Sequence, residues 1–253
     1  ASIFLNIGEG YAIRHQIHSA VLAVLLTKEM EIPRNQMLSL VCAALTMNLA
    51  FLEYQDHLNT RSGGLTADER AMISKHSLIG ELMLMAAGVV DPLWLDSVKF
   101  HHEQWDGSGY PEALAGDTIP LHAQILQMVD MFSARISVRS WGQKELANAT
   151  MADLLRSTAG NKCNPQLIKA LIKALGAYPP GCFVQLANDE LAIVVKRGQL
   201  ATSPIVYSLQ SRGLQLGAPV RRDTSQERFT IKALVPQASV EVPLGLRTLW
   251  GGL

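Results

Sequence analysis

The apolar residues recur at helical intervals over most of the first 178 residues. A ladder of apolar side chains spaced three or four residues apart predicts an amphipathic helix over 11–30. Its members are Ile13, Ile17, Val21, Val24 and Leu25. Residues 37–52 are apolar apart from a few small polar side chains, which predicts a central buried helix. Helical spacing returns over 121–138 and, in shorter segments, over 144–156 and 165–175.

Helix start signals divide the middle of the chain. The pair Thr66 and Glu69 matches a capping box and predicts a helix that runs to about residue 87. Asp91 followed by Pro92 predicts another helix, ending near residue 105, because proline is favoured in the first helical turn. The segment 106–120 contains three glycines and two prolines. This density predicts a loop of about 15 residues, and loops of that length are usually functional.

The pattern changes period after the sequence Tyr-Pro-Pro-Gly at 178–181. Short β-branched or aromatic runs follow, separated by turn residues, and such runs predict strands. They lie at Phe183, 192–195, 205–207 and 229–231. The sequence therefore predicts a mainly α fold, with a helical domain over 1–177 and a small β-rich C-terminal domain over 181–253.

Composition narrows the classes of function. Hydrophobic residues make up 48% and charged residues 17%, which excludes a disordered chain. The 22 basic residues balance the 22 acidic ones, so we expect no nucleic-acid surface built on bulk positive charge. The three cysteines have no C-x-x-C spacing, which favours a reducing, cytoplasmic location. No apolar run approaches the roughly 20 residues of a membrane span, and the missing initiator Met indicates a fragment.

Five residues on the predicted helices are candidate metal ligands. They are His15, His76, His101, His102 and Asp130. Imidazole and carboxylate together suit a transition metal such as Fe, Mn or Zn, and a helical bundle can project such ligands into one interior. Any single histidine can equally be a surface or hydrogen-bonded core residue. The adjacent histidine pair and an aspartate inside an apolar run favour a site, because an unpaired buried carboxylate is costly.

One segment is far more specific than these scattered residues. The sequence His-His-Glu-Gln-Trp-Asp-Gly-Ser-Gly-Tyr-Pro at 101–111, continued by Leu-Ala-Gly-Asp-Thr-Ile-Pro-Leu at 114–121, resembles the defining motif of the HD-GYP family. Members of this family are bacterial phosphohydrolases of the HD superfamily that cleave cyclic di-GMP. The resemblance extends from about residue 11 to 240. It implies an HD-type helical bundle, metal ligands among the five candidates, and a β tail.

The dyad that names the superfamily is not matched. The register places Met47 and Asn48 where the family has an adjacent His-Asp, and Phe51 where it has a lysine. A thioether is a soft ligand, and a neutral amide lacks the anionic oxygens that let one carboxylate bridge two cations. Gln124 and Ser133 stand at further positions where the family carries Arg and Asp. The remaining ligands predict either no metal or a single Fe, Mn or Zn ion at a partial site.

The Gly-Tyr-Pro loop is intact and has two interpretations. Its residues Asp106, Gly107, Gly109, Tyr110 and Pro111 can form a surface for a ligand or a signalling protein, as the resemblance implies, or can buttress the helix that carries the histidine pair. Arg61, in the predicted turn at 61–64, is a candidate phosphate contact or an ordinary solvated side chain.

Three functions follow from these observations. The first is a degenerate, non-hydrolytic HD-GYP domain that acts in cyclic di-GMP signalling as a binding or interaction module, with cyclic di-GMP and a signalling protein as partners. The second is a metal-dependent phosphohydrolase with a reduced metal site, acting on cyclic di-GMP or a related phosphoester. The third is a scaffold that binds a partner through Tyr110 and its loop.

Overall fold

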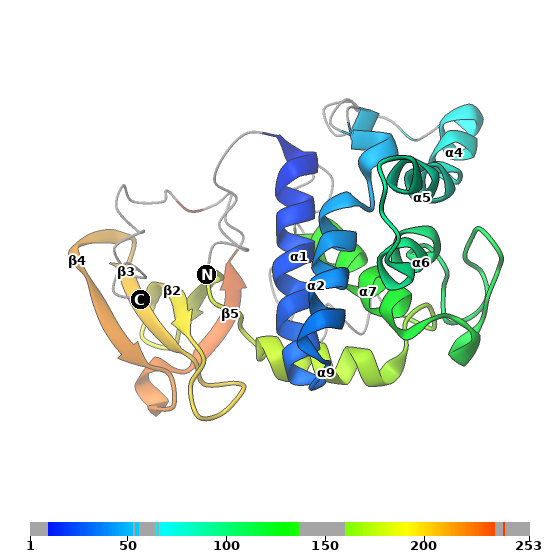
Figure 1. Ribbon diagram of the computed structural model, residues 1–253. Coiled ribbons are helices and arrows are strands. Elements are labelled where there is room, and N and C mark those ends of the chain that lie inside the picture. Colours follow the sequence, from blue (N-terminus) through cyan, green and yellow to red (C-terminus); the bar gives the residue numbers. More distant parts are fainter. Residues whose placement is uncertain are drawn as a thin grey trace. The chain divides into compact units, whose positions relative to one another are not determined.

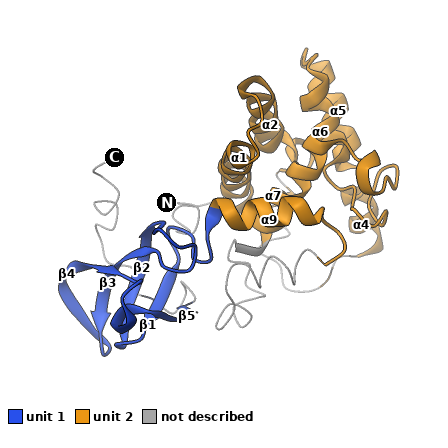
Figure 2. Ribbon diagram, turned by 90° about the horizontal axis from the view of Figure 1, so that it is seen from below, with its two compact units in different colours: residues 1–7, 138–157, 175–253 blue, residues 8–137, 158–174 orange. Residues whose placement is uncertain are grey.

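The computed structural model describes residues 10–52, 54–55, 64, 66–136, 160–235 and 240. The chain forms two compact units (Figure 2). One unit comprises Gly8–Ser137 with Thr158–Ala174, and the other comprises Leu175–Leu253 with two further segments, Ala1–Ile7 and Val138–Ser157. Each unit is described by itself. The predicted helix at 144–156 and the residue Arg61 lie outside the described residues.

The first unit is a helical bundle (Figure 1). Helix α1 packs against α2 and α7, and α6 packs against α2, α5 and α7. The elements are α1 (Tyr11–Glu29), α2 (Arg34–Thr46), the 3-10 turn η1 (Leu49–Phe51), α4 (Ala67–Ile73), α5 (His76–Ala86), α6 (Pro92–Phe100), η2 (Gly116–Thr118), α7 (Leu121–Ile136) and α9 (Pro165–Leu175). No helix among the described residues is long and apolar enough to cross a membrane.

Helix α1 forms as predicted, but much of the apolar row that predicted it faces solvent and not the core. Ile13 and Ile17 are 56% and 48% exposed, whereas Leu22 and Leu26 are fully buried. The buried face also carries polar residues, including His15, because this helix contributes to a polar interior site. Periodicity alone therefore found the helix and misassigned its buried face.

Three predicted helices are shorter than the sequence indicated. The helix predicted over 37–52 ends at Thr46 and is followed by η1, and its outer face is exposed at Leu38 and Leu45. The helix predicted from Thr66 is broken into α4 and α5, and the N–H of Lys75 bonds to the carbonyl of Met72 in the tightened turn between them. Helix α6 ends at Phe100, so the histidine pair lies in the turn that follows it.

The predicted capping box is confirmed at the start of α4. The N–H of Glu69 donates to Oγ1 of Thr66 at 3.2 Å, and the N–H of Thr66 donates to the Glu69 carboxylate at 2.7 Å. We expect Thr66→Ala to lower the free energy of unfolding by about 1 kcal/mol, since an orphan N–H loses its acceptor. Urea unfolding should show this loss, while Ser74→Ala at the other end of α4 should change little. Equal effects of the two substitutions would contradict the capping role.

The second unit contains a five-stranded antiparallel sheet (Figure 1), which agrees with the predicted β appendage. The strand order is β4-β3-β2-β1-β5. The strands are β1 (Phe183–Leu186), β2 (Glu190–Lys196), β3 (Ile205–Ser211), β4 (Leu214–Asp223) and β5 (Ile231–Val235). Apolar clusters cover both faces of β1 and β2, so the central strands form the core.

A charged group also ties the sheet together. The buried carboxylate of Glu190 accepts two hydrogen bonds from the Arg222 guanidinium, each of 2.8 Å, and one from the Ser208 hydroxyl. Strand β4 was not predicted, because most of this edge strand is exposed on both faces and lacks clear alternation. Phe229, predicted as a strand residue, lies instead in a 3-10 turn.

Candidate metal centre

Three histidines from two helix ends meet inside the helical unit. His76 begins α5, and His101 and His102 follow the last residue of α6. The Nε2 atoms of His76 and His101 are 3.4 Å apart, and one donor atom from each of the three rings lies within 4.8 Å of the others. The bundle thus brings together residues that are 25 positions apart in the chain.

Backbone carbonyls orient two of these rings. Nδ1 of His76 donates to the carbonyl oxygen of Ile73, and Nδ1 of His101 donates to that of Val98 at 2.7 Å. Because a carbonyl oxygen can only accept, each Nδ1 carries the proton and each Nε2 presents a lone pair. Two lone pairs that face each other at 3.4 Å cannot bond to one another, whereas they suit a shared cation.

The rings are held neutral. Burial lowers the pKa of His101 from 6.5 to about 4, and the neighbouring His76 lowers it further. Burial and the charge of His101 hold the pKa of His102 well below its usual value, and burial also lowers that of His76. Neutral imidazole is the form that binds a metal, so all three are competent ligands near pH 7.

Two further predicted ligands pair with each other beside this cluster. Nε2 of His15 on α1 lies 2.7 Å from Oδ1 of Asp130 on α7. Burial by itself raises the pKa of Asp130, but the hydrogen bond from His15 and the charges of the surrounding histidines lower it well below its usual range. Asp130 is therefore anionic. It supplies a negative charge that acts on His101 and His102.

The two residues that the resemblance aligns with the dyad lie between the end of α2 and the start of η1. Met47 is fully buried and Asn48 is 4% exposed. The ring of Phe51, in η1, lies 5.8 Å from the His76 ring and is tilted by 40° against it. An aromatic ring thus occupies the position where the resemblance implied a lysine.

These residues fit a metal ion in part. Three neutral imidazoles, two of them oriented by backbone carbonyls, are a donor set that Zn²⁺ and Fe²⁺ accept, and His76, His101 and His102 would hold the ion. A bound ion would polarise a phosphoryl oxygen and lower the pKa of a bound water. Methionine and asparagine at the dyad add no anionic ligand that could bridge a second ion.

The Gly-Tyr-Pro loop covers the cluster. The Tyr110 ring stacks on His102 with centroids 4.7 Å apart and planes at 27°. Tyr110 is half-buried and its pKa is raised by burial, so this side chain belongs to the site. Asp106 is exposed, and its carboxylate accepts hydrogen bonds from the N–H and hydroxyl of Ser108. The geometry favours the buttress interpretation for Tyr110, and a partner protein on the loop stays a prediction.

Gln124 has a structural role that sequence reasoning missed. Its Nε2 donates to the carbonyl of Ile119, and its Oε1 accepts from Asn164 at 2.8 Å. Gln124 therefore joins the end of the loop to the residue before α9. The neutral amide serves this role because it has both a donor and an acceptor, whereas an arginine at the same position would have donors but no acceptor.

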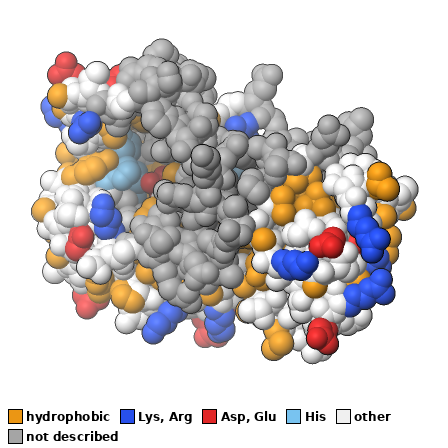
Figure 3. All heavy atoms as spheres, turned by 180° about the vertical axis from the view of Figure 1, so that it is seen from behind, with side chains coloured by type: hydrophobic (Ala, Val, Ile, Leu, Met, Phe, Trp, Pro, Cys, Tyr) orange, Lys and Arg blue, Asp and Glu red, His pale blue; other side chains and the backbone are white. Residues whose placement is uncertain are grey.

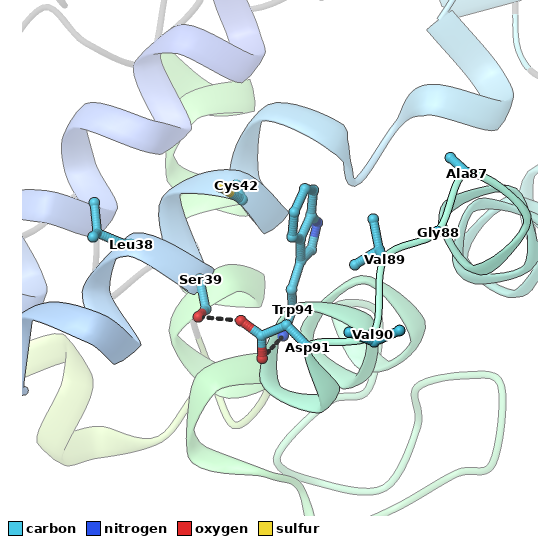
Figure 4. A pocket seen from close by; sticks show the side chains of 9 residues that line it. All are labelled: Leu38, Ser39, Cys42, Ala87, Gly88, Val89, Val90, Asp91 and Trp94. Carbon is cyan, nitrogen blue, oxygen red and sulfur yellow. Dashed lines mark hydrogen bonds between the residues drawn. The ribbon is translucent and has the colours of Figure 1, made fainter.

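The cluster lies below the surface of the helical unit, since His76 and His101 are 3% and 0% exposed. Figure 3 shows histidine side chains in a recess of the helical unit, bordered by apolar side chains. A separate hollow of about 420 Å³ lies between α2 and the start of α6 (Figure 4). Trp94, Val89 and Cys42 line it, and its polar pair, Ser39 and Asp91, is hydrogen-bonded internally. None of the predicted metal ligands lines this hollow.

Comparison with known proteins agrees with this geometry. A cyclic di-GMP phosphodiesterase of Pseudomonas aeruginosa is 28% identical over 212 residues, covering 82% of this chain and 51% of that protein. The cyclic di-GMP phosphodiesterase PdeB of Borreliella burgdorferi is 24% identical, covering 75% of this chain and 50% of its own length. The chain therefore spans about half the length of these curated relatives.

A solved structure shares the fold. The HDG"Y"P protein Bd1817 of Bdellovibrio bacteriovorus superposes with a TM-score of 0.54 at 18% identity. The match covers 65% of this chain and 52% of that one. The sequence model of the HD domain family matches residues 9–167, which is more than half of the chain. The chain therefore belongs to the HD domain family, as its Gly-Tyr-Pro segment predicted.

Proposed function

We propose that this chain is a non-hydrolytic HD-GYP domain that acts as a binding module in cyclic di-GMP signalling. The observation that carries the proposal is the Phe51 ring 5.8 Å from the His76 ring, together with the burial of Met47 and Asn48 just before η1. Two-metal hydrolysis requires ligands that hold both ions and stabilise charge on the attacking and leaving oxygens. A thioether, a neutral amide and a benzyl group provide neither, while the histidine cluster remains assembled.

The relatives support the choice of ligand. They are named cyclic di-GMP phosphodiesterases, and the part of this chain that matches them includes the histidine cluster and the loop. A cyclic dinucleotide could contact the cluster through its phosphates and stack its bases on the aromatic rings of Phe51 and Tyr110. The phosphate contact predicted for Arg61 and the protein partner remain part of this proposal.

We expect no linearisation of cyclic di-GMP by the purified protein, with either Mn²⁺ or Fe²⁺ added. Chromatography of the nucleotide after long incubation checks this expectation, and calorimetric titration in parallel should detect binding. His101→Ala is the matched control. Turnover that this substitution abolishes would overturn the non-hydrolytic proposal, because a contaminating enzyme would be indifferent to the change. Absence of binding in every metal condition would overturn the binding role.

A second candidate function is a phosphodiesterase with a single-metal site. Three histidine donors within 4.8 Å of one another favour it, because a metal can bind there without the dyad. It requires a transition metal in the purified protein and a slow turnover that depends on that metal. Elemental analysis that finds essentially none, together with no turnover, would exclude this candidate.

A further inference from the structure

The acidic residue after the histidine pair holds the loop from inside. Glu103 is 1% exposed, and its two carboxylate oxygens accept the N–H groups of Glu112 at 2.7 Å and Leu114 at 2.9 Å. Hydrogen bonds to a charged acceptor are strong, and leaving a buried carboxylate unpaired would be costly. The far side of the loop is therefore tied to the residue next to His102.

The near side of the loop is pressed against the same segment. A Cβ atom added to Gly109 would lie 2.4 Å from the backbone nitrogen of Gln104 and 2.5 Å from Cα of Glu103, so only glycine fits. The N–H of Tyr110 donates to the carbonyl of His102 at 3.2 Å. The backbone that carries the tyrosine is thus positioned directly over the histidine pair.

These contacts set the place of one aromatic ring. The rings of His76 and His101 are fixed by bonds to backbone carbonyls, and the ring of His102 is stacked by Tyr110 at 4.7 Å. If the tether from Glu103 loosened, the loop backbone and the tyrosine ring would be free to move away. The third histidine, whose ring also contacts those of His76 and His101, would then lose the contact on its tyrosine side.

We infer that Glu103 is a positioning residue that keeps the Tyr110 ring on His102 and so fixes the third ligand of the histidine cluster. Glutamine at this position keeps one acceptor oxygen and turns the other into a donor, which faces an N–H group. Glu103→Gln therefore disrupts one of the two loop bonds with almost no change in side-chain volume. The role of Glu103 in metal binding rests on the proposed function, whereas its role in placing the Tyr110 ring on His102 does not.

The first test is a nuclear magnetic resonance measurement of the metal-free full chain at fixed pH. The face of Tyr110 should shift the His102 ring protons upfield, and Tyr110→Leu should remove this shift. We expect Glu103→Gln to move the same resonances toward the Tyr110→Leu positions. The matched control is Glu112→Gln, which removes the ion pair between this loop residue and Lys99 of α6. This change should leave the His102 resonances in place. Unchanged His102 resonances in folded Glu103→Gln would overturn the inference.

The second test is a double-mutant cycle for Zn²⁺ affinity. Loss of an outer-shell partner typically costs about 10–100-fold, so we expect about a tenfold loss in Glu103→Gln. Because Glu103 acts through the tyrosine, adding this change to Tyr110→Leu should weaken binding less than twofold further. Losses that multiply independently would contradict positioning. If the parent chain binds no Zn²⁺, the metal proposal fails, and the resonance measurement still decides the role of Glu103.

A measurement without substitutions covers the case in which Glu103→Gln does not fold. The amides of Glu112 and Leu114 lie in a loop, and loop amides usually exchange quickly with solvent. The tether predicts that both exchange as slowly as amides of α6. Fast exchange at both positions would show that the tether does not hold in solution.

Discussion

The metal-free protein is expected to lose folding free energy steeply as the pH falls from 6.5 toward 4. Burial lowers the pKa of His101 and of His18 to about 4 in the folded chain, against 6.5 for an exposed histidine. Between these values the unfolded chain binds more protons, so stability is complete above pH 6.5 and declines with acid. A shift of this size corresponds to about 3.4 kcal/mol for each histidine.

The combined loss approaches the whole stability of a typical domain. Two such groups contribute about 7 kcal/mol, compared with roughly 5–15 kcal/mol for folding. The pKa values of His76 and His102 are lowered as well and act in the same direction. Urea unfolding followed by circular dichroism at intervals between pH 7.5 and 4.5 measures the slope.

His18 offers a clean variant because it lies outside the histidine cluster. Its Nδ1 has no hydrogen-bond partner within the described part of the chain. His18→Gln removes the titration, so at pH 5 the variant should have lost about 2 kcal/mol less than the parent. A surface change, Lys75→Gln, should leave the slope unaltered. A parent chain whose stability is flat from pH 6.5 to 5 would show that these histidines titrate normally.

The second large effect is expected from His76→Ala. This histidine supplies one of three clustered nitrogens, and its Nε2 lies 3.4 Å from that of His101. Removal of one imidazole leaves two, which is too few to hold Zn²⁺ tightly. We expect a loss of affinity greater than the roughly 100-fold upper range for outer-shell changes. Competition with a chromophoric chelator measures it.

Metal binding should also raise the thermal stability of the folded chain. An ion that binds only the folded chain stabilises it by about 2.7 kcal/mol at 100 times its dissociation constant. Zn²⁺ should therefore raise the melting temperature of the parent and of His122→Ala, whose imidazole on α7 is not among the clustered donors. It should not raise that of His76→Ala. Equal stabilisation of all three proteins would place the metal elsewhere.

Particular residues show where sequence reasoning succeeded. The motif at 101–111 identified the family, because its glycines and tyrosine are needed at fixed places over the histidine pair. The capping box at Thr66 was readable because it is a local hydrogen-bond pattern. The β appendage was readable from its central strands, which alternate or run apolar because they are buried.

Other features depended on partners distant in the chain. The buried face of α1 could not be predicted from the sequence, because it depends on the packing of α1 against α7, where His15 meets Asp130. The break between α4 and α5 lies in a stretch without glycine or proline, so no local signal marked it. The carboxylate of Glu103 bonds to the backbone N–H groups of Glu112 and Leu114. Every residue except proline carries a backbone N–H, so these bonds leave no signal in the sequence.

The sequence by itself determined the family and the mainly helical bundle with its β appendage, because both are matters of residue identity and local spacing. The tertiary structure alone decided that three candidate histidines share one site, that His15 pairs with Asp130, and that Tyr110 covers His102. Those relations depend on how helices pack, and packing places side chains according to the whole fold.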